Sequence, residues 1–179
     1  MSVDLRVDWC DHKAAKYAVE HWHYSRSLPT PPCEYIGAWE RDKFIGCVIF
    51  SRGSNNNGHK PYGVKLTEFC ELTRIALTKH TAPVSQVTAI ALKLLKMKSP
   101  GVRLVVSYAD PNHDHAGGIY QAGNWIYTGQ TSTDFEAIDP SGRKWHSRQV
   151  SRTGVKRQYG TLGGCAIFAR LGQSPRSQC

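Results

Sequence analysis

The stretch from residue 104 to residue 128 constrains the fold more than any other part of the chain. It begins with Leu104–Tyr108, an apolar run with β-branched residues that is typical of a buried strand. Pro111 cannot continue a central strand, so the run ends before it and a polar loop follows. Residues 119–124 then favour a short helix, and Trp125–Tyr127 favours a second strand. This order of strand, loop, helix and strand predicts an α/β fold.

Polar side chains gather where the first of these strands ends. Asp110 comes directly after the apolar run, and His113, Asp114, His115 and Tyr120 follow it closely. Ligands of open α/β sheets bind at the carboxyl ends of strands, which is where Asp110 would project. An Asp-Pro pair also opens ordinary turns, and loop histidines are often only solvated. A functional site explains the whole group better than a turn does.

The composition fits a single globular domain over residues 1–179, since 40% of the residues are hydrophobic. No apolar run has the length of a membrane span, and the N-terminus has no signal peptide. We therefore expect a cytoplasmic protein without membrane contact. Six cysteines without a CxxC pair predict reduced, mostly buried thiols. The polar residues 171–179 predict a disordered tail.

The charge of the chain indicates a polyanionic partner. The net charge is +9 and the isoelectric point is near 9.4, and basic side chains that neutralise phosphates release counterions. Small basic proteins without such a partner exist, so the clustering of the charges is stronger evidence than their sum. The cluster lies in residues 143–157 and contains Arg143, Lys144, Arg148, Arg152, Lys156 and Arg157.

The remaining elements complete a mixed α/β (α+β) arrangement, with a central sheet flanked by helices. Asp11 is a good N-cap for a helix over residues 11–20, and the aromatic loop 21–29 after it would present His23 and Tyr24. A second helix begins near Thr81, its expected cap, and buries one stripe of its body. The other strands are expected at residues 2–7, 33–39, 43–52, 67–77 and 165–169, with a hairpin over 137–146.

Several motifs in this order resemble those of a known family. They are His23-Tyr24-Ser25, Glu71-Leu72-Thr73-Arg74, Tyr108-Ala109-Asp110-Pro111 and the run from Gly118 to Trp125. The element order resembles the GNAT acyltransferase fold. The motifs, which span about residues 17 to 129, resemble the Mom DNA-modification family of Mu-like phages.

The resemblance implies an enzyme that converts the N6 amine of adenine in double-stranded DNA to a carbamoylmethyl derivative. Phage DNA modified in this way is protected from host restriction enzymes, and the protein would act in the host cytoplasm. By carry-over at matching positions, the catalytic residues are His23, Tyr24, Asp110 and Tyr120. For DNA binding, the motifs and the basic segment indicate Arg74, Asn124, Trp125, Arg148, Arg152 and Arg157.

The chemistry of the reaction can be argued separately. The adenine amine is a poor nucleophile because its lone pair is delocalised into the ring, so a site must position it and remove a proton. Asp110 is suited to accept that proton or orient the base, and Tyr120 to donate to a leaving group or an oxyanion. His23 is suited to shuttle a proton near neutral pH. Base flipping is expected, with Trp22, Tyr24 or Trp125 available to stack on the base.

The group donor is the least determined part. The segment Leu77–Gln86 contains no glycine, and Pro83 lacks an N–H, which argues against a phosphate cradle for acetyl-CoA. The added group has the atoms of a glycine unit, so a glycyl-tRNA type of donor is favoured and tRNA becomes a second partner. A two-histidine, one-carboxylate Fe(II) site of His23, Asp110 and His115 is an alternative.

Two other classes of function stay open. The chain could be an ordinary GNAT acyltransferase that modifies a protein or a small amine. It could also be a non-catalytic DNA-binding module, for which the basic segment alone would suffice. A homodimer is compatible with each of these.

Overall fold

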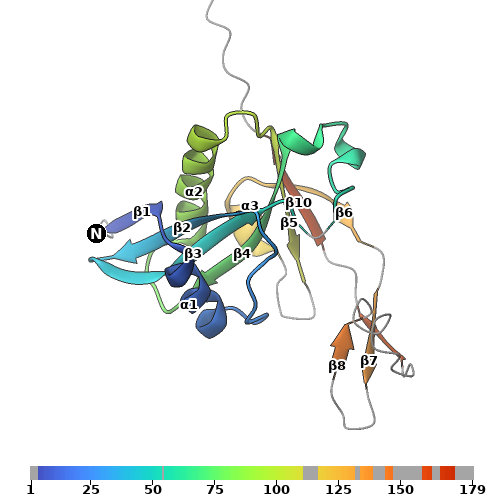
Figure 1. Cartoon of the computed structure of the whole chain (residues 1–179), viewed down its shortest axis with the longest axis horizontal. Coiled ribbons are helices and arrows are strands. Elements are labelled where there is room, and N and C mark those ends of the chain that lie inside the picture. The colour runs from blue at the N-terminus through green and yellow to red at the C-terminus, as the bar shows by residue number, and fades with distance from the viewer. Residues whose placement is uncertain are drawn as a thin grey trace, which may run out of the picture.

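The computed structural model describes residues 4–53, 55–110, 117–131, 134–138, 144–146, 159–162 and 166–171 (Figure 1). Within these ranges the strands form a seven-stranded sheet, in the order β1-β2-β3-β4-β5-β10-β6, and a three-stranded sheet, β8-β7-β9. The elements are β1 (Leu5–Trp9), α1 (His12–Trp22), β2 (Cys33–Glu40), β3 (Lys43–Ser51), η1 (Lys60–Tyr62), η2 (Leu66–Glu68), β4 (Phe69–Leu77), α2 (Val84–Lys98), β5 (Leu104–Ala109), α3 (Gly118–Ala122), β6 (Ile126–Gln130), β7 (Asp134–Ile138), β8 (Lys144–His146), β9 (Tyr159–Leu162) and β10 (Ala166–Leu171).

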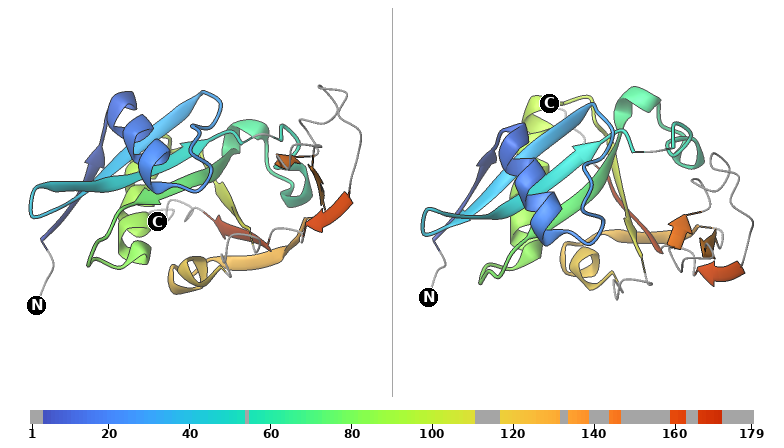
Figure 2. Two further views of the ribbon diagram at one scale, coloured as in Figure 1. Left: turned by 90° about the horizontal axis from the view of Figure 1, so that it is seen from below. Right: turned by 60° about the horizontal axis from the view of Figure 1, so that its bottom comes forward.

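Helices α1 and α2 cover opposite faces of the large sheet, as the two views in Figure 2 show. The alternation of side chains along β3 explains this arrangement, because neighbouring residues of a strand point to opposite faces. Cys47 and Ile49 pack with the α1 residues Ala15 and Val19. The intervening residues of β3 pack with Val87, Ala91 and Leu95 of α2. The sheet therefore has a separate core under each helix, and a third cluster forms around Phe69, Leu104, Val106 and Ala169.

The first helix and the first hairpin form as the sequence predicts. Asp11 caps α1, since its Oδ1 accepts the Ala14 N–H at 2.7 Å. Strands β2 and β3 pair antiparallel through a two-residue turn, Arg41–Asp42, in which both residues have positive φ. Gly46 of β3 has φ +137°, and a Cβ there would overlap the backbone of Ala76 in β4. Only glycine allows these strands to approach so closely.

The start of α2 differs from the prediction. Thr81 does not cap the helix: the N-cap is Pro83, and the Thr81 N–H donates instead to Glu40 at the end of β2. Glu40, which lies 41 positions earlier in the chain, therefore binds the backbone of the residue that was expected to cap the helix. The expected buried stripe is otherwise present in α2, with Ile90 and Leu94 half-buried at its margins.

Strands β4 and β5 are parallel neighbours only at their beginnings. The paired residues are Phe69 with Leu104, Cys70 with Val105 and Glu71 with Val106. Beyond these pairs, Ser107 spans the widening gap with its side chain, and its Oγ donates to the Leu72 carbonyl at 2.8 Å. The strands therefore diverge toward their carboxyl ends, and the candidate site lies there.

The C-terminal part of the sheet is not in chain order. Strand β10 lies between β5 and β6 and pairs antiparallel with both, so the strand after α3 is separated from β5. The expected hairpin is present as β7 and β8 but belongs to the small sheet, which Figure 1 shows apart from the large one. The expected disordered tail lies, after Leu171, outside the described residues. No helix in the described ranges is long and apolar enough to span a membrane.

Candidate active site

A cavity of about 620 Å³ opens where β4 and β5 diverge. This volume is in the range of small-molecule sites, which is roughly 300–1,000 Å³. The lining comes from the end of α1, β4, the β4–α2 turn, β5 and α3, segments far apart in the chain. It consists of Trp22, His23, Tyr24, Leu72, Thr73, Arg74, Ile75, Leu77, His80, Val84, Ser107, Tyr108, Ala109, Gly117, Gly118, Ile119 and Tyr120.

Tyr120 is the most deeply buried of the predicted catalytic side chains. It is 8% exposed, its ring stacks on Phe168 of β10 at 5.0 Å, and Trp125 packs edge-on against it at 5.3 Å. Gly117, just before α3, has φ +78°, and a Cβ there would lie 2.4 Å from the Phe168 ring. A glycine is therefore required at this position for Phe168 to reach Tyr120.

A hydrogen-bonded chain fixes the state of the Tyr120 hydroxyl. Its oxygen lies 2.7 Å from Ser107 Oγ, and Ser107 Oγ lies 2.8 Å from the Leu72 carbonyl. Ser107 Oγ is the donor toward both the Leu72 carbonyl and the Tyr120 oxygen, so these two acceptors share its one proton. The phenol oxygen therefore accepts from Ser107 and keeps its own proton. The geometry suits the hydroxyl to donate to an oxygen of a ligand.

The pKa of Tyr120 is consistent with a neutral phenol. Burial raises the pKa of this hydroxyl above its ordinary value, and the hydrogen bond with Ser107 offsets part of the rise. Tyr24 and Glu71 raise the pKa further, which shows that both groups lie within electrostatic reach of Tyr120. Near neutral pH the group is a phenol and not a phenolate.

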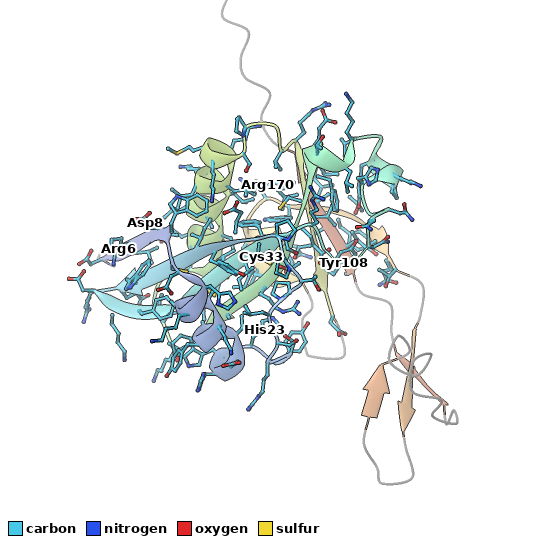
Figure 3. The ribbon with its side chains drawn as sticks, viewed as in Figure 1. Arg6, Asp8, His23, Cys33, Tyr108 and Arg170 are labelled. Atoms are coloured by element: carbon cyan, nitrogen blue, oxygen red, sulfur yellow. The ribbon has the colours of Figure 1, made fainter. Side chains whose placement is uncertain are left out.

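His23 lies directly after α1 as its C-cap, and Figure 3 labels it there, with Tyr108 on β5. Its Nδ1 accepts the Ser25 N–H at 3.1 Å and lies 2.8 Å from Ser25 Oγ. In the neutral ring the proton is therefore on Nε2. The Tyr24 ring packs beside it at 4.3 Å, and Tyr24 is 48% exposed at the cavity.

Arg74 connects the β4 wall to the loop after α1. Its Nε donates to the Ser27 carbonyl at 3.3 Å, and one terminal nitrogen donates to the Thr73 carbonyl at 2.7 Å. A guanidinium has five N–H groups, so two bonds leave others for a ligand. Arg74 therefore both holds the loop that contains His23 and lines the cavity.

The other predicted residues lie beyond the lining. Asp110 comes directly after β5 and is half-buried, next to Ala109, which does line the cavity. Asn124 is exposed after α3 with φ +57°, and Trp125 is buried behind Tyr120, where it supports that ring. A base bound in the cavity would not reach the face of Trp125. Arg148, Arg152, Arg157 and His115 lie outside the described residues.

The structure also adds residues that the sequence did not single out. Ser107 is a serine within the mostly apolar strand β5, and this isolated small polar residue was the signal by which the sequence could have indicated its role. His80 lines the cavity from the β4–α2 turn, and its Nδ1 donates to the Thr78 carbonyl at 2.6 Å. The neutral ring therefore has its lone pair on Nε2, which can accept a proton. Its position in an irregular turn gave no periodic signal.

No metal site forms among the side chains that the structure describes, where no group of three or more His, Cys, Asp or Glu is placed to hold an ion. The hypothesis of His23, Asp110 and His115 includes a residue outside those ranges, so it stays a prediction. The thiols of Cys10, Cys33, Cys47 and Cys70 are free, as expected. Burial raises the pKa of Cys10 and Cys70 to about 12, so these thiols stay protonated.

Comparison with known proteins identifies the family. The model of the Mom protein family matches residues 4–163. The chain belongs to the Mom family. A curated relative, "Methylcarbamoylase mom" of Escherichia phage Mu, is 26% identical over 160 residues. The match covers 87% of this chain but only 65% of the Mu protein, so the chain spans less than two thirds of that relative's length.

The similar solved structures are acetyltransferases. AAC(6′)-Ib in complex with ribostamycin and coenzyme A has a TM-score of 0.57 at 10% identity, covering 94% of this chain and 93% of that one. Ribosomal-protein-S5-alanine acetyltransferase from Vibrio fischeri has a TM-score of 0.52 at 9% identity, covering 96% and 94%. The predicted GNAT-like mixed sheet flanked by helices is thereby confirmed.

Proposed function

We propose that this Mom-family chain transfers a carbamoylmethyl-type group to adenine N6 in double-stranded phage DNA, in the cytoplasm of the host cell, and so protects that DNA from host restriction. One observation supports this most: the cavity at the β4–β5 divergence brings together His23, Tyr24 and Tyr120 from distant segments. These residues belong to the motifs that resemble the family. The name of the Mu relative, a methylcarbamoylase, supports the same class of transfer.

The cavity suits a flipped nucleic-acid base better than the amine of a protein side chain. Its mouth has two aromatic residues, Trp22 and the exposed Tyr24, which can stack on a base that has left the duplex. The Tyr120 hydroxyl accepts a hydrogen bond from Ser107 and keeps its own proton, which it can donate to the developing oxyanion or to the leaving group. The exocyclic amine of adenine has two N–H groups and must lose one proton on transfer.

The transfer requires a base for that proton. In the proposed step the N6 nitrogen forms a bond to the donor carbon, the donor's bond to its leaving group breaks, and the N6 proton passes to a protein base. His23, Asp110 and His80 are the candidates near this point, and the leaving group takes up a proton on departure. Arg74 is placed to hold the oxygen that gains charge in the transition state.

The donor is proposed to be a glycyl ester of the glycyl-tRNA type. An aminoacetyl group and a carbamoylmethyl group are isomers, so one glycine unit contains every atom that is added. Acyl transfer would form the N6–carbonyl bond and break the ester C–O bond. An intramolecular rearrangement would then break the N6–carbonyl and CH2–NH2 bonds and form the N6–CH2 and carbonyl–NH2 bonds of the carbamoylmethyl isomer, with no change in composition. The fold relatives include complexes with coenzyme A, but the β4–α2 turn here has no glycine and contains Pro83.

Nucleoside mass spectrometry tests the proposal. DNA from cells that express the wild-type chain should contain modified adenosine, and labelled glycine in the medium should increase its mass. Tyr120→Phe should reduce the modification by at least about tenfold, which corresponds to one hydrogen bond from the phenol in the transition state. The matched control is Tyr127→Phe, because Tyr127 is exposed on β6 and does not line the cavity.

Two outcomes would contradict the proposal. Unmodified DNA together with transfer to a protein or a small amine would make the chain an ordinary GNAT acyltransferase, a function that the aminoglycoside-acetyltransferase fold relatives favour. Unmodified DNA with tight DNA binding and no transfer would make it a binding module. Incorporation of labelled acetate instead of glycine would overturn only the donor assignment.

A further inference from the structure

The turn between β4 and α2 binds a carboxylate of the protein itself, that of Glu40. The N–H groups of Thr81 and Ala82 both donate to one oxygen of Glu40, at 2.8 and 2.5 Å. Glu40 is the last residue of β2, on a different part of the sheet. The Ala82 N–H is the main reason that the pKa of this carboxyl lies below its ordinary value, with Thr81 and His80 adding to it. Glu40 is therefore charged at neutral pH.

This turn is where a phosphorylated ligand of the cavity would be bound. It leads into α2, a helix of 15 residues, and the N–H groups at a helix start are the usual ligands of phosphate. The cavity reaches the turn, because His80 and Val84 are among its lining residues. Pro83, the N-cap, has no N–H to offer. Of the N–H groups that lead into the helix, Glu40 occupies those of Thr81 and Ala82.

A tethered carboxylate is hard to displace from such a place. It competes with a free ligand at an effective concentration on the order of millimolar, without losing the freedom that a free ligand loses on binding. A phosphate next to it would also meet a like charge. We propose that Glu40 is a built-in anion that closes this turn to phosphate, so that the group donor presents no phosphate at the start of α2.

This inference rests on the proposed transferase function and restricts the chemical class of the group donor. Coenzyme A has its pyrophosphate close to the acyl-bearing arm, so a donor of that kind does not fit a turn filled by Glu40. An aminoacyl ester on a ribose has no pyrophosphate next to the acyl group, and its nearest phosphate can lie outside the cavity. A turn filled by Glu40 is therefore compatible with an aminoacyl ester as the group donor.

Calorimetric titration with inorganic pyrophosphate and with coenzyme A tests the role of Glu40 without any DNA. Wild-type protein should give no saturable binding of either probe. Glu40→Ala frees both N–H groups and should bind pyrophosphate at least about tenfold more tightly than wild type. Glu40→Gln keeps an acceptor but loses the charge, so its gain should be smaller. The control is Glu20→Ala, which removes an exposed carboxylate of α1 that pairs with Lys16.

Binding of coenzyme A by the wild type with an affinity that Glu40→Ala leaves unchanged or weakens would overturn the inference. So would a folded Glu40→Ala or Glu40→Gln protein, checked by circular dichroism, in which neither variant gains affinity for pyrophosphate. DNA modification is measured separately by nucleoside mass spectrometry. Failure of that assay with the expected titrations would reject the proposed function alone, and the reverse result would reject only the role of Glu40.

Discussion

In two regions beside the cavity, a side chain from another strand binds backbone groups of β4 or of the turn that follows it. We call them the tyrosine region, around Ser107 and Tyr120, and the turn region, around Glu40. In the tyrosine region, Ser107 donates to the Leu72 carbonyl and to the Tyr120 oxygen, and all three residues are buried. In the turn region, Glu40 accepts from Thr81 and Ala82 through a charged group near solvent. The first arrangement orients the hydroxyl of a residue that lines the cavity, whereas the second only occupies backbone N–H donors. We therefore expect chemistry to depend on the tyrosine region and ligand selection on the turn region.

The largest expected effect separates packing from hydrogen bonding in the tyrosine region. Gly117→Ala puts a Cβ into the Phe168 ring at a left-handed φ, and should lower the free energy of unfolding by about 2–4 kcal/mol. Gly63→Ala is the matched control, since Gly63 has φ +63° with no atom within 4 Å of the added Cβ. It should cost only about 1 kcal/mol. Urea unfolding measures both, and equal losses would show that Phe168 has room to move.

The next effect concerns the serine itself. Ser107→Ala leaves the buried Tyr120 hydroxyl and Leu72 carbonyl without this partner, which should cost about 1–3 kcal/mol and reduce adenine modification. Ser51→Ala removes a buried hydroxyl that accepts the Gly53 N–H and lies outside the cavity lining. It should destabilise the protein without a specific loss of modification per folded molecule. Equal activity of the two variants would remove Ser107 from the mechanism.

The smallest effect is the pH dependence of the turn region. The pKa of Glu40 is lower in the folded chain than in the unfolded chain, so its contribution to stability is complete above the unfolded pKa and is lost as the pH falls through the folded pKa. Glu40→Gln should therefore reduce the fall in stability between about pH 5 and about pH 3. Ser107→Ala should leave that slope unchanged. Urea midpoints over this range measure it, and parallel curves for wild type and Glu40→Gln would contradict the prediction.

Local signals in the sequence were sufficient for much of the fold. The Asp11 cap, the hairpin of β2 and β3, and the strand that ends just before Asp110 each depend on residues close together in the chain. These elements are correct because neighbouring residues determine caps, turns and alternation. The resemblance of the motifs supplied the family, which the comparison with known proteins then confirmed.

The features that could not be predicted from the sequence are contacts between residues far apart in the chain. Nothing near Thr81 shows that Glu40 takes its N–H, and nothing near Tyr120 shows that Phe168 stacks on its ring. The insertion of β10 between β5 and β6 has the same origin, since strand order depends on long-range contacts. In the candidate site, the residue types were predicted, but the hydrogen bond from Ser107 to Tyr120 depends on the contact between β5 and α3.

The stacking of Phe168 on Tyr120 has a consequence for the order in which the molecule is completed during synthesis. Strands β1 to β4 each pair with their neighbour in the chain, so they can assemble early. Strand β5 can pair with β4, but its other edge stays uncovered and the Tyr120 ring has no stacking partner until residues 166–171 leave the ribosome. A nascent chain therefore acquires most of its sheet before the packing around Tyr120, and a partly made molecule has a fold without a complete candidate site.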